Sequence, residues 1–513
     1  MNSSKQIKMG AIISYGTIAF NMIAGLIYTP WMIDKIGQDN YGLYTLATSL
    51  ITMFVMDFGM GAAVSRFVSR YRAEDNQKAV NDFLGIVYKL YLFIDAIILL
   101  VLVVLYFFLD SVYANLTPGE ISTFKVLYVI VGLFSVISFP FTNLNGILTS
   151  YERFAEMKIC DLFHKAFIIA AMVIALLMGY GIYALVLVNA ISGLLTIGLK
   201  LLIIHRKTKV KVHMRYFDKG IFKEIFGFSV WTTVKSIMHR LVFNITPSII
   251  AAVSVTGAAG VAIFGLASTI EGYVYTFATA INGMFMPRIS RIIVSGKKEE
   301  ELLPLMVRIG RIQLMIIGFI TVAFIAFGKS FVVEIWNKPD FSLSYICAVL
   351  IIIPSVFYLP MQIANTTIIV ENKVKLQAYV FIWMGLINVI CSVILSRLYG
   401  AIGASVSILI AYMVRTVAMG TIYHKSLKLN MIVFIKETFL KLSPHLGITL
   451  VAGILLELWN PIQNAYLRFG VNGIVLVGVF LGVMMLNGFN TYEKNLLFGF
   501  VGKLFRKIKS KGE

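Results

Sequence analysis

Charged residues are scarce in this 513-residue chain. Asp, Glu, Lys and Arg together make up 14% of it, whereas 59% of the residues are hydrophobic. In an ordinary soluble domain about a quarter of the residues are charged. The mean hydropathy of +0.85 agrees, so the composition excludes a soluble globular protein and predicts a polytopic membrane protein.

The sequence also has few residues suited to a metal or catalytic site. Its three cysteines, Cys160, Cys347 and Cys391, lie far apart in apolar runs, and its six histidines are scattered. There is no HExxH or GxSxG motif, and the loops carry mostly cations where a membrane transferase would expose paired carboxylates. We therefore expect no catalytic residues, no metal, no cofactor and no enzyme activity.

A nucleotide-driven motor is missing as well. Gly328-Lys329-Ser330 resembles the end of a P-loop, but Ala323 stands where that motif requires its first glycine. The segment also lies at the predicted outer end of a helix. No ATP motor is predicted.

Apolar segments of about 20 residues, the length that crosses a bilayer as a helix, recur along the whole chain. We predict an all-α integral membrane protein with about 14 transmembrane helices. The predicted spans cover residues 9–33, 41–64, 84–109, 124–149, 160–179, 183–204, 227–252, 258–286, 307–328, 343–370, 375–396, 400–423, 438–458 and 470–490.

The net charge of +20 would suggest a nucleic-acid binder in a soluble protein, so the positions of the cations decide its meaning. With the N-terminus inside, most of the 45 Lys and Arg residues fall in inner segments. Only six lie in or beside outer segments, namely Lys35, Lys125, Lys329, Lys338, Arg397 and Arg468. The positive-inside rule predicts this asymmetry. We expect a protein of the cytoplasmic (inner) membrane with both termini cytoplasmic, in contact with lipid and not with nucleic acid.

One segment with a central proline occurs twice, at a single constant offset along the chain. The matched pairs are Ser135 with Ser355, Pro140 with Pro360, and Asn145 with Asn365. Six spans separate the start of one copy from the start of the other, so both copies enter the membrane with the same orientation. We predict two parallel six-helix repeats plus two C-terminal helices; a likeness of apolar helices by composition alone is the alternative.

The longest and most basic inner connection, residues 205–226, separates the two sets of six spans. We expect an N-lobe over 1–204 and a C-lobe over 227–424. Two further spans lie within 425–490, and a basic cytoplasmic tail covers 491–513. Ligand sites in transporters built from parallel repeats lie near the membrane midplane between the lobes.

The seventh span is the most informative for binding chemistry. Lys235 and His239 are four residues apart and share a helix face, whereas Arg240 lies about 100° further round and Asn244 one turn beyond it. Together with Arg415 in the twelfth span, these residues predict a cationic wall of a hydrated cavity that binds a substrate anion such as a phosphate. The alternative is that the long side chains reach the inner interface.

Acidic residues inside spans are candidates for ion coupling or internal ion pairs. Asp57, Asp95 and Glu271 lie in apolar spans, where an ionised carboxylate is costly and is expected to face the bundle interior. Glu271 is the leading candidate for H+ or Na+ coupling and could pair with Arg240 or Lys235 when no anion is bound. For Asp57 and Asp95 the alternative is a structural partner for a neighbouring cation.

Three prolines inside predicted spans, Pro140, Pro247 and Pro360, could let their helices flex. A fixed packing kink is the alternative explanation.

Three stretches carry a family resemblance: IGQDNYGLYTLATSLITMFVMDFGMGAAVSRF, MPRISRIIVSGKKEEELLPLMVRIGR and YGAIGASVSILIAYMV. In their order and spacing from the N-terminus to Lys425 they resemble the multidrug, oligosaccharidyl-lipid and polysaccharide (MOP) exporter superfamily, in particular its polysaccharide branch of Wzx-type flippases. None of the three is a strict catalytic signature.

This resemblance implies a two-lobed flippase that moves polyprenyl-pyrophosphate-linked oligosaccharide units, of an O-antigen (lipopolysaccharide), capsule or exopolysaccharide, to the outer leaflet by alternating access. It implies a polysaccharide polymerase and glycosyltransferases as partners. Lipid II and sporulation flippases are related alternatives, but the first span has no Lys or Arg after Lys8, where lipid II flippases are expected to carry arginines. A cation-coupled multidrug efflux carrier and a scaffold without transport activity are the other hypotheses.

Overall fold

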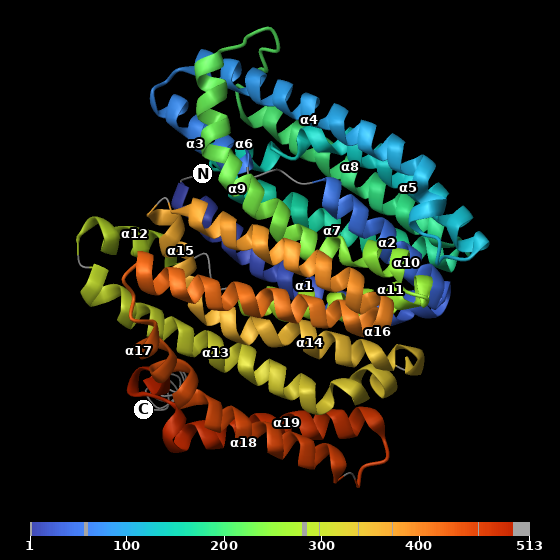
Figure 1. Ribbon diagram of the computed structural model, residues 1–513. Coiled ribbons are helices and arrows are strands. Elements are labelled where there is room, and N and C mark those ends of the chain that lie inside the picture. The colour runs from blue at the N-terminus through green and yellow to red at the C-terminus, as the bar shows by residue number, and fades with distance from the viewer. Residues whose placement is uncertain are drawn as a thin grey trace, which may run out of the picture. The chain divides into compact units, whose positions relative to one another are not determined.

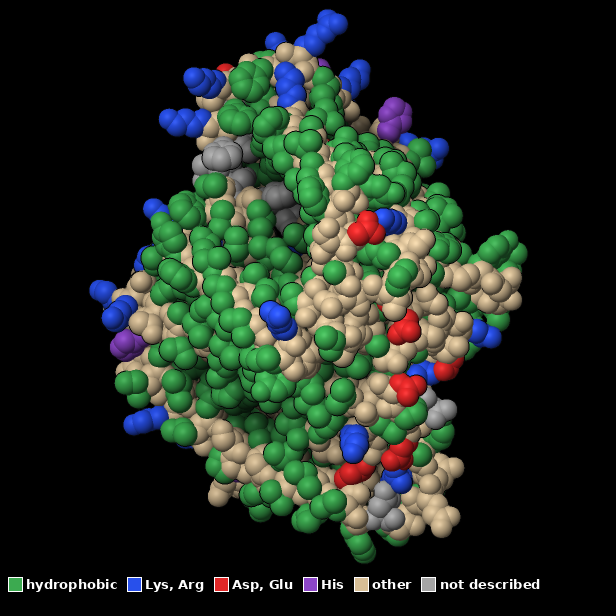
Figure 2. Space-filling view, turned by 45° about the vertical axis from the view of Figure 1, so that its right-hand side comes forward, with side chains coloured by type: hydrophobic (Ala, Val, Ile, Leu, Met, Phe, Trp, Pro, Cys, Tyr) green, Lys and Arg blue, Asp and Glu red, His purple; other side chains and the backbone are tan. Residues whose placement is uncertain are grey.

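The computed structural model describes residues 3–55, 60–279, 285–296, 298–336, 338–371, 373–459 and 461–495. Over these ranges the regular structure is entirely helical, and none of it is β-strand (Figure 1). The predicted all-α class is confirmed. Large apolar side chains stand exposed, for example Phe107, of which 75% is accessible, and hydrophobic side chains cover much of the face in Figure 2. Such a surface fits contact with lipid. Helices also suit a bilayer, because they satisfy their own backbone hydrogen bonds.

The chain forms two compact units. The first comprises Met1–Thr269 and Val374–Arg415, and the second comprises Ile270–Lys373 and Thr416–Glu513. The predicted division into an N-lobe and a C-lobe with a linker between them stays a prediction.

The first unit contains the helices from the N-terminus to the first part of α11. They are α1 (Ser3–Ile36), α2 (Gln38–Phe54), α3 (Met60–Ala73), α4 (Gln77–Val112), α5 (Pro118–Ser138), α6 (Leu144–Ser150), α7 (Phe154–Leu177), α8 (Ile182–Lys207), α9 (Lys219–Asn244), α10 (Thr246–Val253) and α11 (Gly257–Thr279). Most of α16 (Val374–Ser426) completes the unit.

The second unit takes the end of α11, the end of α16 and the helices between and after them. These are α12 (Met286–Val294), α13 (Lys298–Ser330), α14 (Ser342–Tyr358), α15 (Gln362–Val370), α17 (Met431–Ile435), α18 (Lys441–Leu458) and α19 (Ala465–Val483). Within this unit α13 packs along α14 and α18, and α18 packs along α19.

Eleven described helices are long and apolar enough to cross a membrane, or twelve if one bent pair counts as a single span. The chain is thus a multi-pass membrane protein. Helix α16 alone covers two predicted spans, 375–396 and 400–423, which join at Gly400, where φ is 58° and ψ is −134°. Part of the second predicted span lies at 56–59, outside the described residues. The count of fourteen stays a prediction.

The two predicted proline segments adopt the same local structure. Helix α5 gives way to a 3-10 turn at Phe139–Phe141 and then to α6. Helix α14 gives way to a 3-10 turn at Leu359–Met361 and then to α15. Pro140 and Pro360 lie in these turns, because proline lacks the N–H that would continue the α-helical hydrogen bonds.

The stretch between α8, which continues to Lys207, and α9, which begins at Lys219, forms the middle of the predicted connection 205–226. Its backbone docks on the first turns of α4. The N–H of Lys211 donates to Asn81 Oδ1 at 2.9 Å, and the N–H of His213 donates to the Asn81 carbonyl at 3.2 Å. His213 Nδ1 also lies 2.7 Å from Asp82 Oδ1. This part of the connection is therefore held against a helix.

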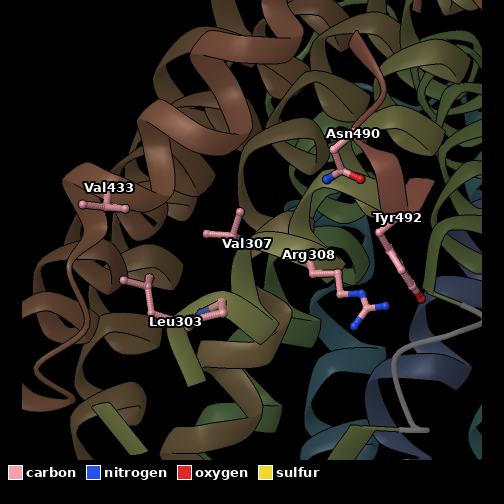
Figure 3. Close-up of a pocket in the computed structure, with 7 residues that line it drawn as sticks. Leu303, Val307, Arg308, Val433, Asn490 and Tyr492 are labelled. Atoms are coloured by element: carbon pink, nitrogen blue, oxygen red, sulfur yellow. The ribbon is translucent and has the colours of Figure 1, made fainter. Parts of the chain in front are cut away.

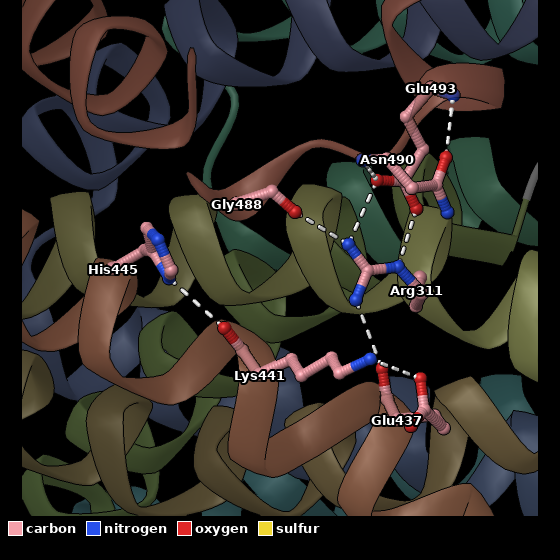
Figure 4. A network of polar contacts seen from close by, with 7 residues as sticks. All are labelled: Arg311, Glu437, Lys441, His445, Gly488, Asn490 and Glu493. Carbon is pink, nitrogen blue, oxygen red and sulfur yellow. Dashed lines mark hydrogen bonds and ion pairs between the residues drawn. The ribbon is translucent and has the colours of Figure 1, made fainter. Parts of the chain in front are cut away.

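A buried ion pair fixes the chain after α19 onto α13 (Figure 4). Arg311 donates from Nε to Glu493 at 2.6 Å, and from its other nitrogens to Glu493, to the carbonyl of Gly488 at 2.6 Å and to the carbonyl of Glu437 at 2.9 Å. Only 5% of the Arg311 side chain and 1% of the Glu493 side chain is accessible. The first residues of the predicted tail thus pack against the membrane helices.

Candidate functional site

Lys235, His239 and Arg415 meet around one aromatic ring in the first unit. Helix α9 presents Lys235 and His239 one turn apart, as predicted, and α16 presents Arg415. Lys235 Nζ lies 5.6 Å and Arg415 Cζ lies 4.8 Å from the centroid of the Phe381 ring, and the His239 ring lies 5.8 Å from it. Together with Tyr412, these residues form what we call the cationic cluster.

Tyr412 closes the cationic cluster on the second half of α16. Its hydroxyl lies 3.3 Å from His239 Nε2, and its ring lies 5.6 Å from the guanidinium carbon of Arg415. Phe381 and Tyr412 are buried, with 2% of each accessible, and 8% of Arg415 is accessible. The two cations thus lie in a mostly nonpolar setting, where electrostatic interactions are stronger than in water.

The balance of charge at the cationic cluster favours an anion. A cation over an aromatic ring gains roughly 0.5–2 kcal/mol, but two cations near one ring also repel each other. In the part of the chain that the structure describes, no carboxylate forms an ion pair with Lys235, and the ring of Phe381 is the partner of its ammonium. A ligand with negatively charged oxygens would relieve the repulsion and satisfy the ammonium donors.

Arg240 lies apart from that ring. Its guanidinium donates to the carbonyl of Thr52 on α2 at 3.1 Å. The structure thus separates Arg240 from Lys235 and His239, as the difference of about 100° around the helix predicts. Asn244 is the last residue of α9 and is half-buried.

The seventh predicted span is broken where the sequence places Pro247. Residues Thr233–Asn244 and Thr246–Val253 differ in direction by 43°, and Pro247 lies in the first turn of α10, where proline is tolerated. The break follows His239 within about two helical turns. Whether Pro140, Pro247 and Pro360 allow flexing stays a prediction.

The predicted acidic residues belong to different parts of the chain. Asp95 lies on α4, is 9% accessible, and its Oδ1 has no hydrogen-bond partner among the described residues. Glu271 is also 9% accessible and belongs to the second unit. Asp57 lies outside the described residues. Their roles in ion coupling or pairing stay predictions.

The aromatic partners of the cations were missed by the sequence analysis. Along α9, Trp231, Lys235, His239 and Phe243 follow one another at intervals of four residues, so they form one stripe. Across from the start of this stripe, Lys375 Nζ lies 5.2 Å from the Trp231 ring. This four-residue interval in the sequence could have shown that the two aromatic residues share a helix face with Lys235 and His239.

The remaining contacts of this stripe are also aromatic. The Trp231 ring lies 5.4 Å from that of Tyr379, and the Phe243 ring lies 5.9 Å from that of Tyr412. Cations and rings therefore alternate along the seam between α9 and α16. A seam of this kind suits a ligand that carries both negative charge and flat or apolar surface.

Comparison with known proteins gives consistent matches. A family model described as polysaccharide biosynthesis protein matches residues 7–293, more than half of the chain. An uncharacterised membrane protein of Methanocaldococcus jannaschii is 22% identical over 380 residues, covering 72% of this chain and 85% of that protein.

Two solved structures share the fold. One is the lipid II flippase MurJ in an inward closed conformation, with a TM-score of 0.72 and 17% identity over 96% of this chain and 99% of the other. Another is a multidrug resistance MATE family transporter of the MOP superfamily in an inward-facing conformation, with a TM-score of 0.63 and 16% identity over 80% of this chain and 96% of the other. At these identities the likeness concerns the fold alone.

Proposed function

We propose that this chain, which belongs to the polysaccharide biosynthesis protein family of the MOP superfamily of membrane transporters, is a flippase for a polyprenyl-pyrophosphate-linked oligosaccharide. The family and the structural neighbours are those of transporters and flippases and not of enzymes. The proposed substrate is a repeat unit of an O-antigen, a capsule or an exopolysaccharide. A polysaccharide polymerase and glycosyltransferases are its proposed partners.

One observation carries this proposal: Lys235 and Arg415 lie over the same ring of Phe381, and no described carboxylate pairs with Lys235. A diphosphate at this place would accept paired N–H bonds from Arg415 and would meet the Lys235 ammonium as a point charge. The Tyr379 ring, of which 46% is accessible, and the Trp231 ring beside it offer flat surfaces for sugar rings or for the first isoprenoid unit. The lipid tail would remain in the bilayer.

The transport step would use the helix breaks of the first unit. The bend between α9 and α10 follows the stripe of Lys235 and His239, and Gly400 interrupts α16 between Phe381 and Tyr412. A change of angle at either break would alter the spacing of the cationic cluster. Release of the diphosphate at the outer side would follow from such a change. Asp95 and Glu271 are the proposed sites of Na+ or H+ coupling.

A lipid II or sporulation-type flippase is the second candidate, favoured by the likeness to the fold of MurJ. It would use the same diphosphate chemistry with a different glycan. A cation-coupled efflux carrier would need carboxylates at the binding position, whereas Lys235, His239 and Arg415 carry or accept positive charge.

The test uses the full-length protein in proteoliposomes that contain a fluorescently labelled polyprenyl-pyrophosphate oligosaccharide. Quenching from outside reports the labelled lipid that has crossed. Lys235→Gln and Arg415→Gln should each lower the flipping rate about tenfold or more, because each removes a charged hydrogen bond to the diphosphate. Arg397→Gln, which changes an exposed arginine on the same helix α16, is the matched control and should leave the rate unchanged.

Two further substrates separate the candidates. Labelled lipid II flipped faster than the oligosaccharide lipid would favour the lipid II candidate. Export of a cationic dye, undiminished in Lys235→Gln and Arg415→Gln, would favour the efflux carrier. Equal flipping of the oligosaccharide lipid by the wild type and both variants would overturn the proposal.

A further inference from the structure

A groove of about 510 Å³ lies in the second unit, among helices other than those that carry the cationic cluster. Its apolar wall consists of Leu303, Pro304, Val307 and Val433. Its polar residues are Arg308, Asn490 and Tyr492. Figure 3 shows Arg308 and Tyr492 side by side, with Val433 and Leu303 across from them.

Arg308 is a cation whose hydrogen-bonding capacity is not used by the described protein. Its guanidinium carbon lies 3.1 Å from the centroid of the Tyr492 ring, so one face is covered. Its Nε is buried and has no hydrogen-bond partner among the described residues. One turn further along α13, Arg311 makes four hydrogen bonds to Glu493, Gly488 and Glu437. The hydrogen-bond acceptors in this region therefore pair with Arg311 and not with Arg308.

Other donors line the same groove. Asn490 uses its Oδ1 and its backbone N–H to cap the turn that ends at Glu493. Within the described ranges, the side-chain amide nitrogen of Asn490 and the hydroxyl of Tyr492 form no hydrogen bond, and both residues are exposed. The groups that face an occupant of the groove can therefore all donate hydrogen bonds. They are the guanidinium of Arg308, the amide nitrogen of Asn490 and the hydroxyl of Tyr492.

The groove lies at one end of three candidate membrane spans. Arg308 is near the start of the span Glu300–Ile335, Val433 is near the start of Met431–Leu458, and Asn490 follows the end of Ala465–Gly488. By the predicted topology these are all inner ends. Lys436 and Lys494 are exposed close by in the sequence. A basic pocket between membrane helices on the cytoplasmic side is the setting in which proteins bind anionic lipid headgroups.

We propose that this groove binds an anionic phospholipid of the inner leaflet. The phosphate accepts hydrogen bonds from the open edge of the Arg308 guanidinium and from the Asn490 amide. The first part of an acyl chain lies along Leu303, Val307 and Val433. The groove matches such a ligand because it joins one unpaired cation to an apolar wall.

The C-terminal segment of the chain itself fits the groove poorly. Residues 496–513 contain the cations Lys503, Arg506, Lys507, Lys509 and Lys511, and a single acid, Glu513. Their charge has the same sign as that of Arg308, so the segment would repel it. The observations therefore favour a lipid over an intramolecular occupant.

The test is native mass spectrometry and thermal unfolding of the full-length detergent-solubilised protein. The probes are phosphatidylglycerol, phosphatidylcholine of the same chain length, and inorganic phosphate. Phosphatidylglycerol should bind and raise the unfolding temperature, while the other two should not at equal concentration. Arg308→Gln should weaken phosphatidylglycerol binding about tenfold. Arg206→Gln, which removes an exposed arginine at the end of α8, should leave it unchanged.

A second variant keeps the charge and fills the groove. Val307→Trp should also abolish phosphatidylglycerol binding. If Arg308→Gln does not fold, this variant still tests whether the lipid binds in the groove. Binding of phosphatidylglycerol that is the same in wild type, Arg308→Gln and Val307→Trp would overturn the proposal. Stabilisation by inorganic phosphate alone would overturn the lipid assignment, and so would equal binding of phosphatidylcholine.

Discussion

Lys235 and Arg415 lie over one aromatic ring although they are far apart in the sequence, with Nζ 5.6 Å and Cζ 4.8 Å from the centroid of Phe381. Like charges in a buried setting lower the stability of the empty protein. Functional sites often retain such a cost because it is recovered when the ligand binds. Removing one of the two charges should therefore raise the stability of the ligand-free protein and weaken the binding of an anion.

The first prediction concerns Lys235→Met, which removes one charge and keeps the apolar stem. We expect the ligand-free protein to unfold about 1–3 °C higher than the wild type, because the repulsion with Arg415 is gone. Stabilisation by added inorganic pyrophosphate should be lost. Differential scanning fluorimetry with and without pyrophosphate measures both. Arg397→Met, which removes an exposed cation of α16 outside the seam, should leave the pyrophosphate response intact. A response that survives in Lys235→Met would contradict the binding role.

The second prediction concerns the docking of the connection on α4. A Cβ atom at Gly85 would collide with the backbone carbonyl of His213, so Gly85→Ala should displace the segment around Lys211 and His213. The lysines and arginines of this segment should then be cut faster by trypsin. Gly132→Ala is the control, because the nearest atom to a Cβ there is a Leu102 side-chain carbon at 3.8 Å. Equal cleavage rates of both variants and the wild type would refute the docking.

The third prediction concerns the buried pair of Arg311 and Glu493. Arg311→Met should lower the free energy of unfolding by about 3–5 kcal/mol, because it leaves a buried carboxylate without its partner. The double variant Arg311→Met with Glu493→Met should recover much of that loss. Chemical or thermal unfolding of purified protein measures the cycle. Lys125→Met serves as a comparison, since its pair with Asp110 is partly exposed and should contribute at most about 1 kcal/mol. Additive losses in the double variant would show that the two residues act independently.

The fourth prediction concerns Gly400, whose positive φ breaks α16. Alanine adopts this conformation only under strain, so Gly400→Ala should cost about 1–3 kcal/mol of stability. Gly447 lies inside α18, where an added Cβ would meet nothing within 4 Å, and Gly447→Ala should be neutral or slightly stabilising. Thermal unfolding of the two variants gives the comparison. An unchanged unfolding temperature for Gly400→Ala would mean that the turn between the two parts of α16 does not depend on glycine.

Helix positions followed from the sequence because apolar length alone sets them. The predicted spans 160–179 and 183–204 correspond to α7 and α8 with ends shifted by a few residues. At Pro140, Pro247 and Pro360 the helices change direction or tighten, whereas Pro30 and Pro354 lie inside helices, so a proline alone does not tell where a helix ends. The boundary between the predicted spans 375–396 and 400–423 was also predicted from the sequence, and the non-helical residue of α16, Gly400, lies directly after it.

The partners of charged residues followed from the sequence much less well. The spacing of Lys235 and His239 placed them on one face, but Phe381 and Tyr412 come from a helix much later in the chain. In the same way, Arg308 and Arg311 look alike in sequence. Only tertiary packing makes Arg311 a buried structural cation and leaves Arg308 beside a groove. Periodicity reports which face a residue occupies and not what lies opposite.

The first unit combines two separate stretches of the chain, and this has a consequence for how the protein is made. The unit needs Val374–Arg415, which the ribosome delivers only after the whole stretch from Ile270 to Lys373. At the usual translation speed of roughly 5–20 residues per second, this delay amounts to several seconds or more. During that interval Lys235 on α9 lacks the ring of Phe381, so we expect the first unit to reach its final packing only after α16 has been inserted.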